Sequence, residues 1–197
     1  NVYSGVQVYD SQGNFIQRLL SSSPGSSSTP WVDVSGDRIA LADNGQIDIY
    51  RQDGSFALEQ TLTTSNQWIR KMVMSGNRIM ASVWTSFNEE AIFEWEFNGL
   101  TWSPILGVDL EGGSVKDIDL DGNVLAIAMS YNTYVYELQG GVWTQTQLIN
   151  TDGSQVALSI SGDRILIGES GGATLGQARI FEKVASSWVQ RATLVPV

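Results

Sequence analysis

The chain contains no cysteine and no histidine among its 197 residues, and only 4 prolines. Without cysteine, disulfides and thiolate metal sites are excluded. The absence of cysteine also leaves the redox compartment of the protein undetermined. Without histidine as well, the chain cannot form a Ser-His-Asp triad, a Cys-His pair or a zinc-water site of the usual kind. Most hydrolase mechanisms are therefore excluded, and the enzyme chemistry that remains depends on carboxylates.

Basic residues are also scarce, because 11 Lys and Arg face 21 Asp and Glu, giving a net charge of −10. This balance repels phosphate backbones and anionic membranes, and Arg70-Lys71 is the only adjacent basic pair. The hydrophobic runs are as short as strands, far below the roughly 20 residues of a spanning helix. We therefore expect neither a nucleic-acid partner nor insertion into a membrane.

Aromatic residues recur with a long and regular period. One series has intervals of 41, 46, 41 and 45 residues, a second lies six or seven residues before it, and Gly-Asp or Gly-Asn steps keep the same period. The series are Phe15, Phe56, Trp102, Trp143 and Trp188; Tyr9, Tyr50, Trp95, Tyr136 and Phe181; and Gly36, Gly76, Gly122 and Gly162. A repeat of this size with strand-like patterning indicates a β-propeller with four-stranded blades.

Each copy is patterned as four strands. In residues 31–41, two β-prone runs flank a Gly-Asp step that suits a two-residue hairpin, and residues 46–50 alternate between polar and apolar side chains. A polar turn then leads into the fourth strand. We predict an all-β chain forming a single propeller domain over 1–197, with an outer half-blade at 1–20 and full blades at 31–64, 69–107, 114–149 and 155–195.

The first copy is incomplete, since residues 1–20 hold only a third and a fourth strand. We expect four and a half blades from a longer propeller, with inner strands preceding Asn1. The lack of an initiator Met favours a processed or partly observed chain. The alternative is a compact ring of four or five blades with an irregular first blade.

The segment from Asp117 to Gly122 has the pattern D-x-D-x-D-G, which resembles the opening of a calcium loop. Asp117, Asp119 and Asp121 are therefore the candidate metal ligands. The repeat favours another interpretation, because Gly122 keeps the period of the hairpin glycines and Val124 and Leu125 follow where a further acid would be needed. We expect a first strand entering its hairpin, and no cofactor.

Three segments resemble the FG-GAP repeats of integrin-α-like β-propellers, especially their bacterial and algal forms. They are residues 156–168 (VALSISGDRILIG), 176–182 (GQARIFE) and 187–190 (SWVQ). The resemblance covers nearly the whole chain and implies a propeller fold. Integrin-type blades carry calcium between strands one and two, where Asp117, Asp119 and Asp121 lie here. The Phe-Gly and Gly-Ala-Pro signatures are replaced at 41–43, 82–84 and 128–130.

Binding is expected on the face formed by the two-to-three and four-to-one connections, because their lengths and compositions vary among the copies. Trp84, Phe87 and Tyr131 are the candidate contact residues, since exposed aromatics supply contact area to proteins and stacking faces to sugars. The alternative is that these three pack between blades. Trp102, Trp143 and Trp188 recur with the period, which predicts a role in blade packing.

These patterns predict a non-catalytic scaffold that binds a protein partner or belongs to a larger assembly, in an adhesion-type role outside the cell or at its surface. One alternative is a propeller lectin, whose glycan sites would be expected to repeat with the blades. Another is a carboxylate-dependent enzyme, which needs two acids converging at the centre of the ring.

Overall fold

The computed structural model describes residues 5–22, 31–65, 67–85, 89–110, 113–151, 154–171 and 176–196, with the side chains of Gln155 and Val156 excepted. Every regular element in these ranges is a β-strand, so the prediction of an all-β chain is confirmed. Among the described residues, no helix is long and apolar enough to cross a bilayer. The strands form two compact units, β1 to β10 and β11 to β18.

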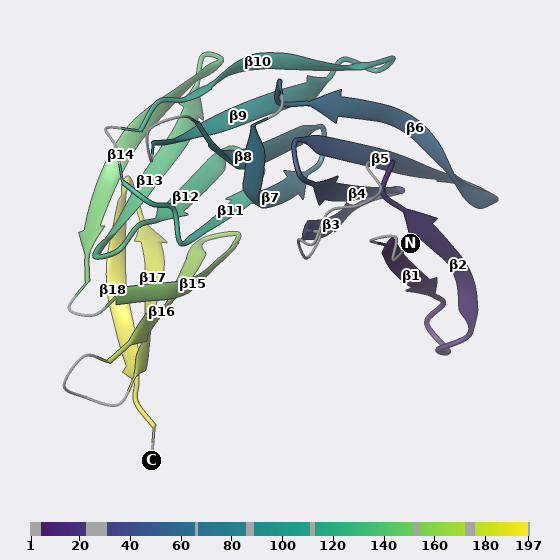
Figure 1. Cartoon of the computed structure of the whole chain (residues 1–197). Coiled ribbons are helices and arrows are strands. Elements are labelled where there is room, and N and C mark those ends of the chain that lie inside the picture. Colours follow the sequence, from purple (N-terminus) through teal and green to yellow (C-terminus); the bar gives the residue numbers. More distant parts are fainter. Residues whose placement is uncertain are drawn as a thin grey trace. The chain divides into compact units, whose positions relative to one another are not determined.

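The first unit contains one pair of strands and two four-stranded sheets (Figure 1). The pair is β1 (Gly5–Tyr9) and β2 (Phe15–Leu20). The first complete sheet is β3 (Trp31–Ser35), β4 (Arg38–Asp43), β5 (Gln46–Asp53) and β6 (Ser55–Thr63). The second is β7 (Trp68–Ser75), β8 (Arg78–Trp84), β9 (Glu90–Phe97) and β10 (Trp102–Val108).

The second unit contains two further four-stranded sheets. One is β11 (Asp117–Asp121), β12 (Val124–Ala128), β13 (Asn132–Gln139) and β14 (Val142–Asn150). The other is β15 (Ser154–Ser161), β16 (Arg164–Ser170), β17 (Gln177–Val184) and β18 (Ser187–Leu194).

In all four complete sheets the strands are antiparallel and follow one another in chain order, as in a propeller blade. The hairpin between the first two strands turns on a glycine with φ between 56° and 60°, at Gly36, Gly76, Gly122 and Gly162. That left-handed conformation is accessible to glycine without steric cost, and two-residue hairpins require it. The Gly-Asp and Gly-Asn steps therefore form the turns that the sequence predicts.

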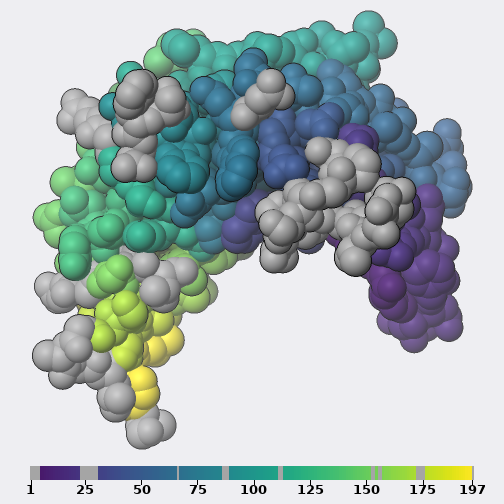
Figure 2. All heavy atoms as spheres, in the orientation of Figure 1, coloured from purple at the N-terminus to yellow at the C-terminus, as the bar shows by residue number. Residues whose placement is uncertain are grey.

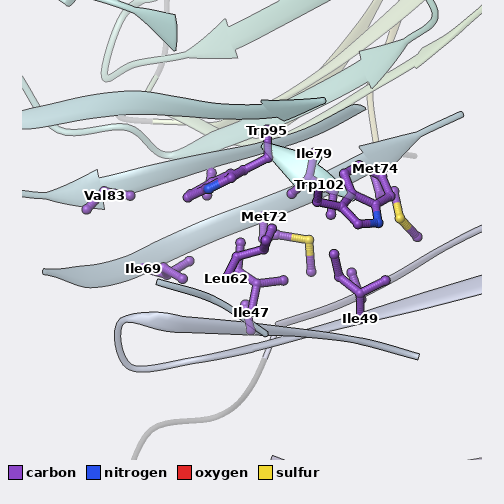
Figure 3. Close-up of a cluster of buried hydrophobic side chains, with 13 residues drawn as sticks. Ile47, Ile49, Leu62, Ile69, Met72, Met74, Ile79, Val83, Trp95 and Trp102 are labelled. Atoms are coloured by element: carbon purple, nitrogen blue, oxygen red, sulfur yellow. The ribbon is translucent and has the colours of Figure 1, made fainter. Parts of the chain in front are cut away.

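A hydrophobic core joins the two complete sheets of the first unit (Figure 3). Ile47 and Ile49 of β5 lie opposite Met72 and Met74 of β7, and Trp102 of β10 is only 2% exposed. Burying a large aromatic side chain removes 150–250 Å² of surface from water, which makes such residues dominant in a core. Trp102 therefore stabilises the packing of one sheet on the next.

The second unit has an equivalent core, in which Trp188 is 3% exposed and Phe181 is also buried. These residues pack with Leu158 and Ile160 of β15. Trp143, at the same repeat position in β14, is only half-buried. The period predicts a packing role for all three tryptophans. Trp102 and Trp188 are buried accordingly, whereas Trp143 is covered only in part.

A glutamine side chain links each pair of neighbouring sheets within a unit. Gln60 of β6 donates its amide to the Trp102 carbonyl and accepts the Trp102 N–H, both at 2.8 Å. Gln147 of β14 binds Trp188 in the same way, at 2.8 and 2.7 Å. Because each contact satisfies a backbone donor and a backbone acceptor together, it fixes the position of the next outer strand.

Arg38 of β4 forms part of the junction between the two complete sheets of the first unit. Its guanidinium donates to Glu59 of β6 at 2.7 and 2.8 Å, and its Cζ lies 4.3 Å from the centroid of the Phe97 ring. Trp102 Nε1 donates to the same carboxylate at 3.3 Å. The hydrogen bond from Arg38, followed by that from Trp102, holds the pKa of Glu59 below its ordinary value, although burial opposes the shift.

This pKa shift predicts a pH dependence of stability. The charged form of Glu59 is favoured in the folded state, so its contribution is fully present above the unfolded-state pKa of about 4.3 and is lost as the pH falls through the lower folded pKa. We expect the free energy of unfolding to drop more between pH 5 and pH 3 in the parent chain than in Glu59→Gln. Urea unfolding at each pH measures both. Equal losses in the two proteins would contradict the prediction, and Asp163→Asn, at an exposed acid, is the control.

Candidate functional site

The three acids of the D-x-D-x-D-G segment lie on one face of β11, at the junction with β15. Asp117 accepts a hydrogen bond from the backbone N–H of Leu158 at 2.9 Å. Asp119 accepts the N–H of Ile160 and Asp121 that of Gly162, both at 2.6 Å. Each acceptor binds a donor 41 residues later, so the carboxylates follow the edge of the neighbouring strand in register.

The junction between β3 and β7 in the first unit has the same design. Asp33 accepts the N–H of Met74 at 2.7 Å, and the Ser35 hydroxyl accepts that of Gly76 at 2.8 Å. Calcium requires six to eight oxygen ligands, whereas these oxygens are directed at backbone donors. Within the described residues no three acidic side chains are grouped so that they could hold a metal. The acids of β11 thus fit a structural role and do not fit a calcium site.

The candidate binding residues have separate positions. Trp84 ends β8 in the first unit and is 38% exposed, whereas Tyr131 precedes β13 in the second unit and is 61% exposed. Phe87 lies outside the described residues. The structure therefore gives Trp84 and Tyr131 accessible rings, and it does not bring them together in one unit.

Trp84 belongs to a larger group of exposed aromatics in the first unit. Trp68, at the start of β7, is its direct cross-strand partner and is 62% exposed. Trp31, at the start of the neighbouring inner strand β3, is 38% exposed. We call Trp31, Trp68 and Trp84, together with Arg70 and Lys71, the tryptophan patch.

The two cations of the tryptophan patch lie over its rings. Arg70 Cζ is 5.7 Å from the centroid of the Trp84 ring, and Lys71 Nζ is 4.3 Å from that of Trp31. The register of β7 on β8 shifts between Ile69 and Lys71, which leaves Arg70 in a β-bulge. Bulges redirect side chains at functional sites. The only adjacent basic pair of this acidic chain is thus combined with its exposed tryptophans.

The patch does not belong to the repeat. In the other complete sheets, the position of Trp84 holds Asn44, Ser130 and Ser170, and that of Trp31 holds Lys71, Asp117 and Ala157. Sequence reasoning found Trp84 but missed Trp31 and Trp68. Both lie outside the aromatic period, and that departure was the available signal. An exposed tryptophan that the repeat does not require indicates a role other than blade packing.

An open pocket of about 480 Å³ lies on the last sheet. It is lined by Gly168, Glu169, Gly176, Gln177, Ala178, Leu194, Val195 and Pro196. Glu169, its one acid, is buried in an ion pair with Arg179 and accepts the Gln177 amide at 3.0 Å. Both carboxylate oxygens are therefore engaged in structural contacts.

Two other buried acids are similarly engaged. Glu94 pairs with Arg78 inside the second sheet. Asp48 accepts hydrogen bonds from the Ser22 N–H at 2.6 Å and from the Thr61 hydroxyl at 2.7 Å. A buried charge is costly unless it is paired and hydrogen-bonded, and these groups satisfy that requirement within the fold.

No family model matches the chain. No curated protein matches it in sequence. The resemblance to FG-GAP repeats therefore stays a prediction, as does the location outside the cell.

Solved structures do match. One, from Bacteroides uniformis, has the description "putative 6-phosphogluconolactonase"; it is 14% identical with a TM-score of 0.71, and the match covers 98% of this chain and 64% of that one. The computationally designed protein Ika8 is 14% identical with a TM-score of 0.69, covering 94% and 54%. The designed protein Ika4 is 11% identical with a TM-score of 0.58, covering 81% and 94%.

This chain thus spans less than two thirds of the first two of these proteins. Identities of 11 to 14% support a shared fold and nothing about activity. Together with the sheet order, they show that the chain has a β-propeller fold of four-stranded antiparallel blades, of which four are complete and one is represented by β1 and β2.

Proposed function

We propose that this chain is a non-catalytic propeller module that binds a protein partner through the tryptophan patch. The observation that carries the proposal is the exposure of three tryptophans that the repeat does not require, beside the only adjacent basic pair of the chain. The patch also lies where the two-to-three connection leaves β8, on the face that varies among the blades.

The chemistry of the patch suits a protein partner. Tryptophan and arginine are enriched among the residues that contribute most to binding energy at protein interfaces. The tryptophan side chain has only two rotatable χ angles and therefore loses little conformational entropy for the area it buries. Arg70 and Lys71 favour a partner with an acidic surface, and they steer it more strongly at low salt than at high salt.

Two features support a non-catalytic role over an enzymatic one. Three of the buried carboxylates, those of Asp48, Glu94 and Glu169, are engaged in hydrogen bonds or ion pairs within their own unit. The chain also has no histidine to act as a general base. The 6-phosphogluconolactonase description belongs to the neighbour, and at 14% identity it carries no activity to this chain.

Replacing the exposed tryptophans is expected to weaken binding without unfolding the chain. Trp68→Ala and Trp84→Ala should each weaken partner binding at least tenfold, about 1.4 kcal/mol or more. The same variants should keep their stability within about 1 kcal/mol, because a cross-strand aromatic pair contributes about 0.2–1 kcal/mol and neither side chain belongs to the core. Affinity capture from extracts of the source, followed by titration of the captured protein, measures the loss. Leu100→Ala, at an exposed hydrophobic position on the β9–β10 turn, is the matched control.

A glycan array distinguishes the lectin alternative, since tryptophan rings also stack on sugars. Saturable binding to a glycan that Trp68→Ala removes would replace the protein partner with a carbohydrate ligand. A captured protein that both tryptophan variants retain as strongly as Leu100→Ala does would contradict the role of the patch.

A further inference from the structure

Arg70 is the one arginine of the tryptophan patch, and no acid in the described part of the chain forms an ion pair with it. Its side chain is exposed, and its guanidinium Cζ lies 5.7 Å from the centroid of the Trp84 ring. Six other arginines do form ion pairs with carboxylates: Arg38, Arg51, Arg78, Arg164, Arg179 and Arg191. In a chain with 21 acidic and 11 basic residues, this arginine is set apart by its lack of an acid among the described residues.

The β-bulge of β7 explains the free guanidinium. Ile69 and Lys71 have cross-strand partners on β8, whereas Arg70 between them has none. A bulge leaves its extra residue outside the ladder and re-aims the side chain. Both strands reach the surface of the first unit, where their blue atoms are visible in Figure 2. The local backbone thus presents Arg70 to solvent.

A guanidinium held over an indole ring favours a carboxylate ligand. The ring attracts the cation, while the planar fork of N–H donors matches the two oxygens of a carboxylate. Lys71, whose Nζ lies 4.3 Å from the centroid of the Trp31 ring, adds a second positive charge. Proteins that recognise phosphorylated segments generally use clusters of arginines, and the patch has a single arginine. A carboxylate is therefore the anion that the patch fits better.

Trp68 supplies apolar surface beside this guanidinium. It is 62% exposed and lies directly opposite Trp84 on the neighbouring strand. Trp68 and Arg70 are alternate residues of β7, which places them about 6.6 Å apart along the strand. In a polyproline II segment, residues i and i+2 are separated by about 6.2 Å. A proline two residues from an acid can therefore lie on the indole while the acid reaches the guanidinium.

We propose that the tryptophan patch binds an extended, proline-containing segment of its partner, one acidic residue of which forms a bidentate ion pair with Arg70. The acid supplies specificity, and the prolines supply contact area on Trp68 and Trp84. Proline-rich segments suit aromatic surfaces because their preformed conformation loses little entropy on binding. This binding mode rests on the proposed function, because it assigns a ligand chemistry to the same patch.

Synthetic peptides test this binding mode on the intact chain. The probe is Gly-Pro-Pro-Glu-Pro-Pro-Gly with both ends blocked, so that the glutamate carries its only charge. A titration followed by the side-chain N–H signals of tryptophan and arginine in ¹H–¹⁵N spectra should show saturable shifts at Trp68, Trp84 and Arg70. Replacing the glutamate with glutamine should weaken binding about tenfold or more, because the neutral amide forms no ion pair.

Variants of the chain separate the shape of the guanidinium from its charge. Arg70→Lys keeps the charge but loses the planar fork, so it should weaken binding of the glutamate peptide about fivefold or more. Arg164→Lys is the matched control, because Arg164 lies on β16 in the other unit and its side chain is 70% exposed. Both variants should unfold at the urea concentration of the parent chain. A large loss of stability in Arg70→Lys would assign the guanidinium to the fold and overturn the proposal.

The remaining outcomes distinguish this binding mode from the function of the patch. Equal affinity of the glutamate and glutamine peptides, or of the parent and Arg70→Lys, would overturn the role of Arg70, whereas the proposed function would stand if Trp68→Ala still weakened binding. The absence of saturable shifts at about 5 mM peptide would overturn the proline segment as the ligand. Tighter binding of the same peptide with phosphoserine in place of glutamate would also overturn the proposal, because it would assign the patch to a phosphorylated segment.

Discussion

Trp188→Ala is expected to lower the free energy of unfolding by about 3–5 kcal/mol, whereas Trp68→Ala lowers it by no more than about 1 kcal/mol. Trp188 is 3% exposed within the core of the last two sheets, so its removal leaves a cavity that the surrounding strands cannot fill. Trp68 is 62% exposed and leaves no cavity. Urea unfolding followed by far-UV circular dichroism measures both without relying on the tryptophan signal.

The phenylalanine variants separate packing from hydrogen bonding. Trp102 Nε1 donates to Glu59 at 3.3 Å, whereas within the described structure Trp188 Nε1 has no acceptor. Trp102→Phe should therefore cost more than Trp188→Phe, because only the first removes a hydrogen bond to a charged group. Equal losses for Trp188→Ala and Trp68→Ala would mean that the aromatic period does not mark the packing positions.

Asp119→Ala is expected to lower the free energy of unfolding by about 1.5–3 kcal/mol. The carboxylate accepts the Ile160 N–H at 2.6 Å and its neighbour Leu120 N–H at 2.9 Å, and alanine leaves both donors without this acceptor. Asp119→Asn should cost less, because the amide oxygen still accepts while the charge is lost. Combining the alanine changes at Asp117, Asp119 and Asp121 should give the largest loss of the series, measured by urea unfolding.

The same series tests the calcium interpretation of this segment. If the carboxylates serve the junction with β15, the melting temperature of the parent chain is the same with calcium as with a chelator. A calcium-dependent rise that the triple variant lacks would contradict the structural role. Asp163→Ala is the control for removing an acid, since its side chain is 65% exposed and should cost less than about 0.5 kcal/mol.

Much of the fold could be predicted from local patterns in the sequence. Glycine at positive φ specifies the hairpin between the first two strands of each complete blade, and alternation specifies which side of a strand is apolar. Both signals concern residues close together in the chain, so they identify β-strands, turns and blade order without coordinates. The burial of Trp102 and Trp188 was predictable from the aromatic period, whereas Trp143 at the same repeat position is only half-buried.

The candidate site was less predictable. Trp84 was found from the length of its connection, but its neighbours Trp31 and Trp68 lie 53 and 16 residues away in the sequence. The pairing of β7 with β8 places Trp68 next to Trp84. Trp31 joins them because β3 packs beside β7 in the neighbouring sheet. The role of Asp119 could not be predicted either. Its carboxylate accepts the N–H of Ile160, which belongs to the next blade, 41 residues later in the sequence.

The sequence alone determined the class of fold, the blade repeat and the absence of histidine and cysteine chemistry, because these depend on composition and on contacts within one copy. Tertiary structure alone decided what the acids of β11 bind and which tryptophans gather into a patch. Those properties depend on contacts between strands distant in sequence. The period of the repeat does not predict which of the residues that depart from it will lie next to one another in space.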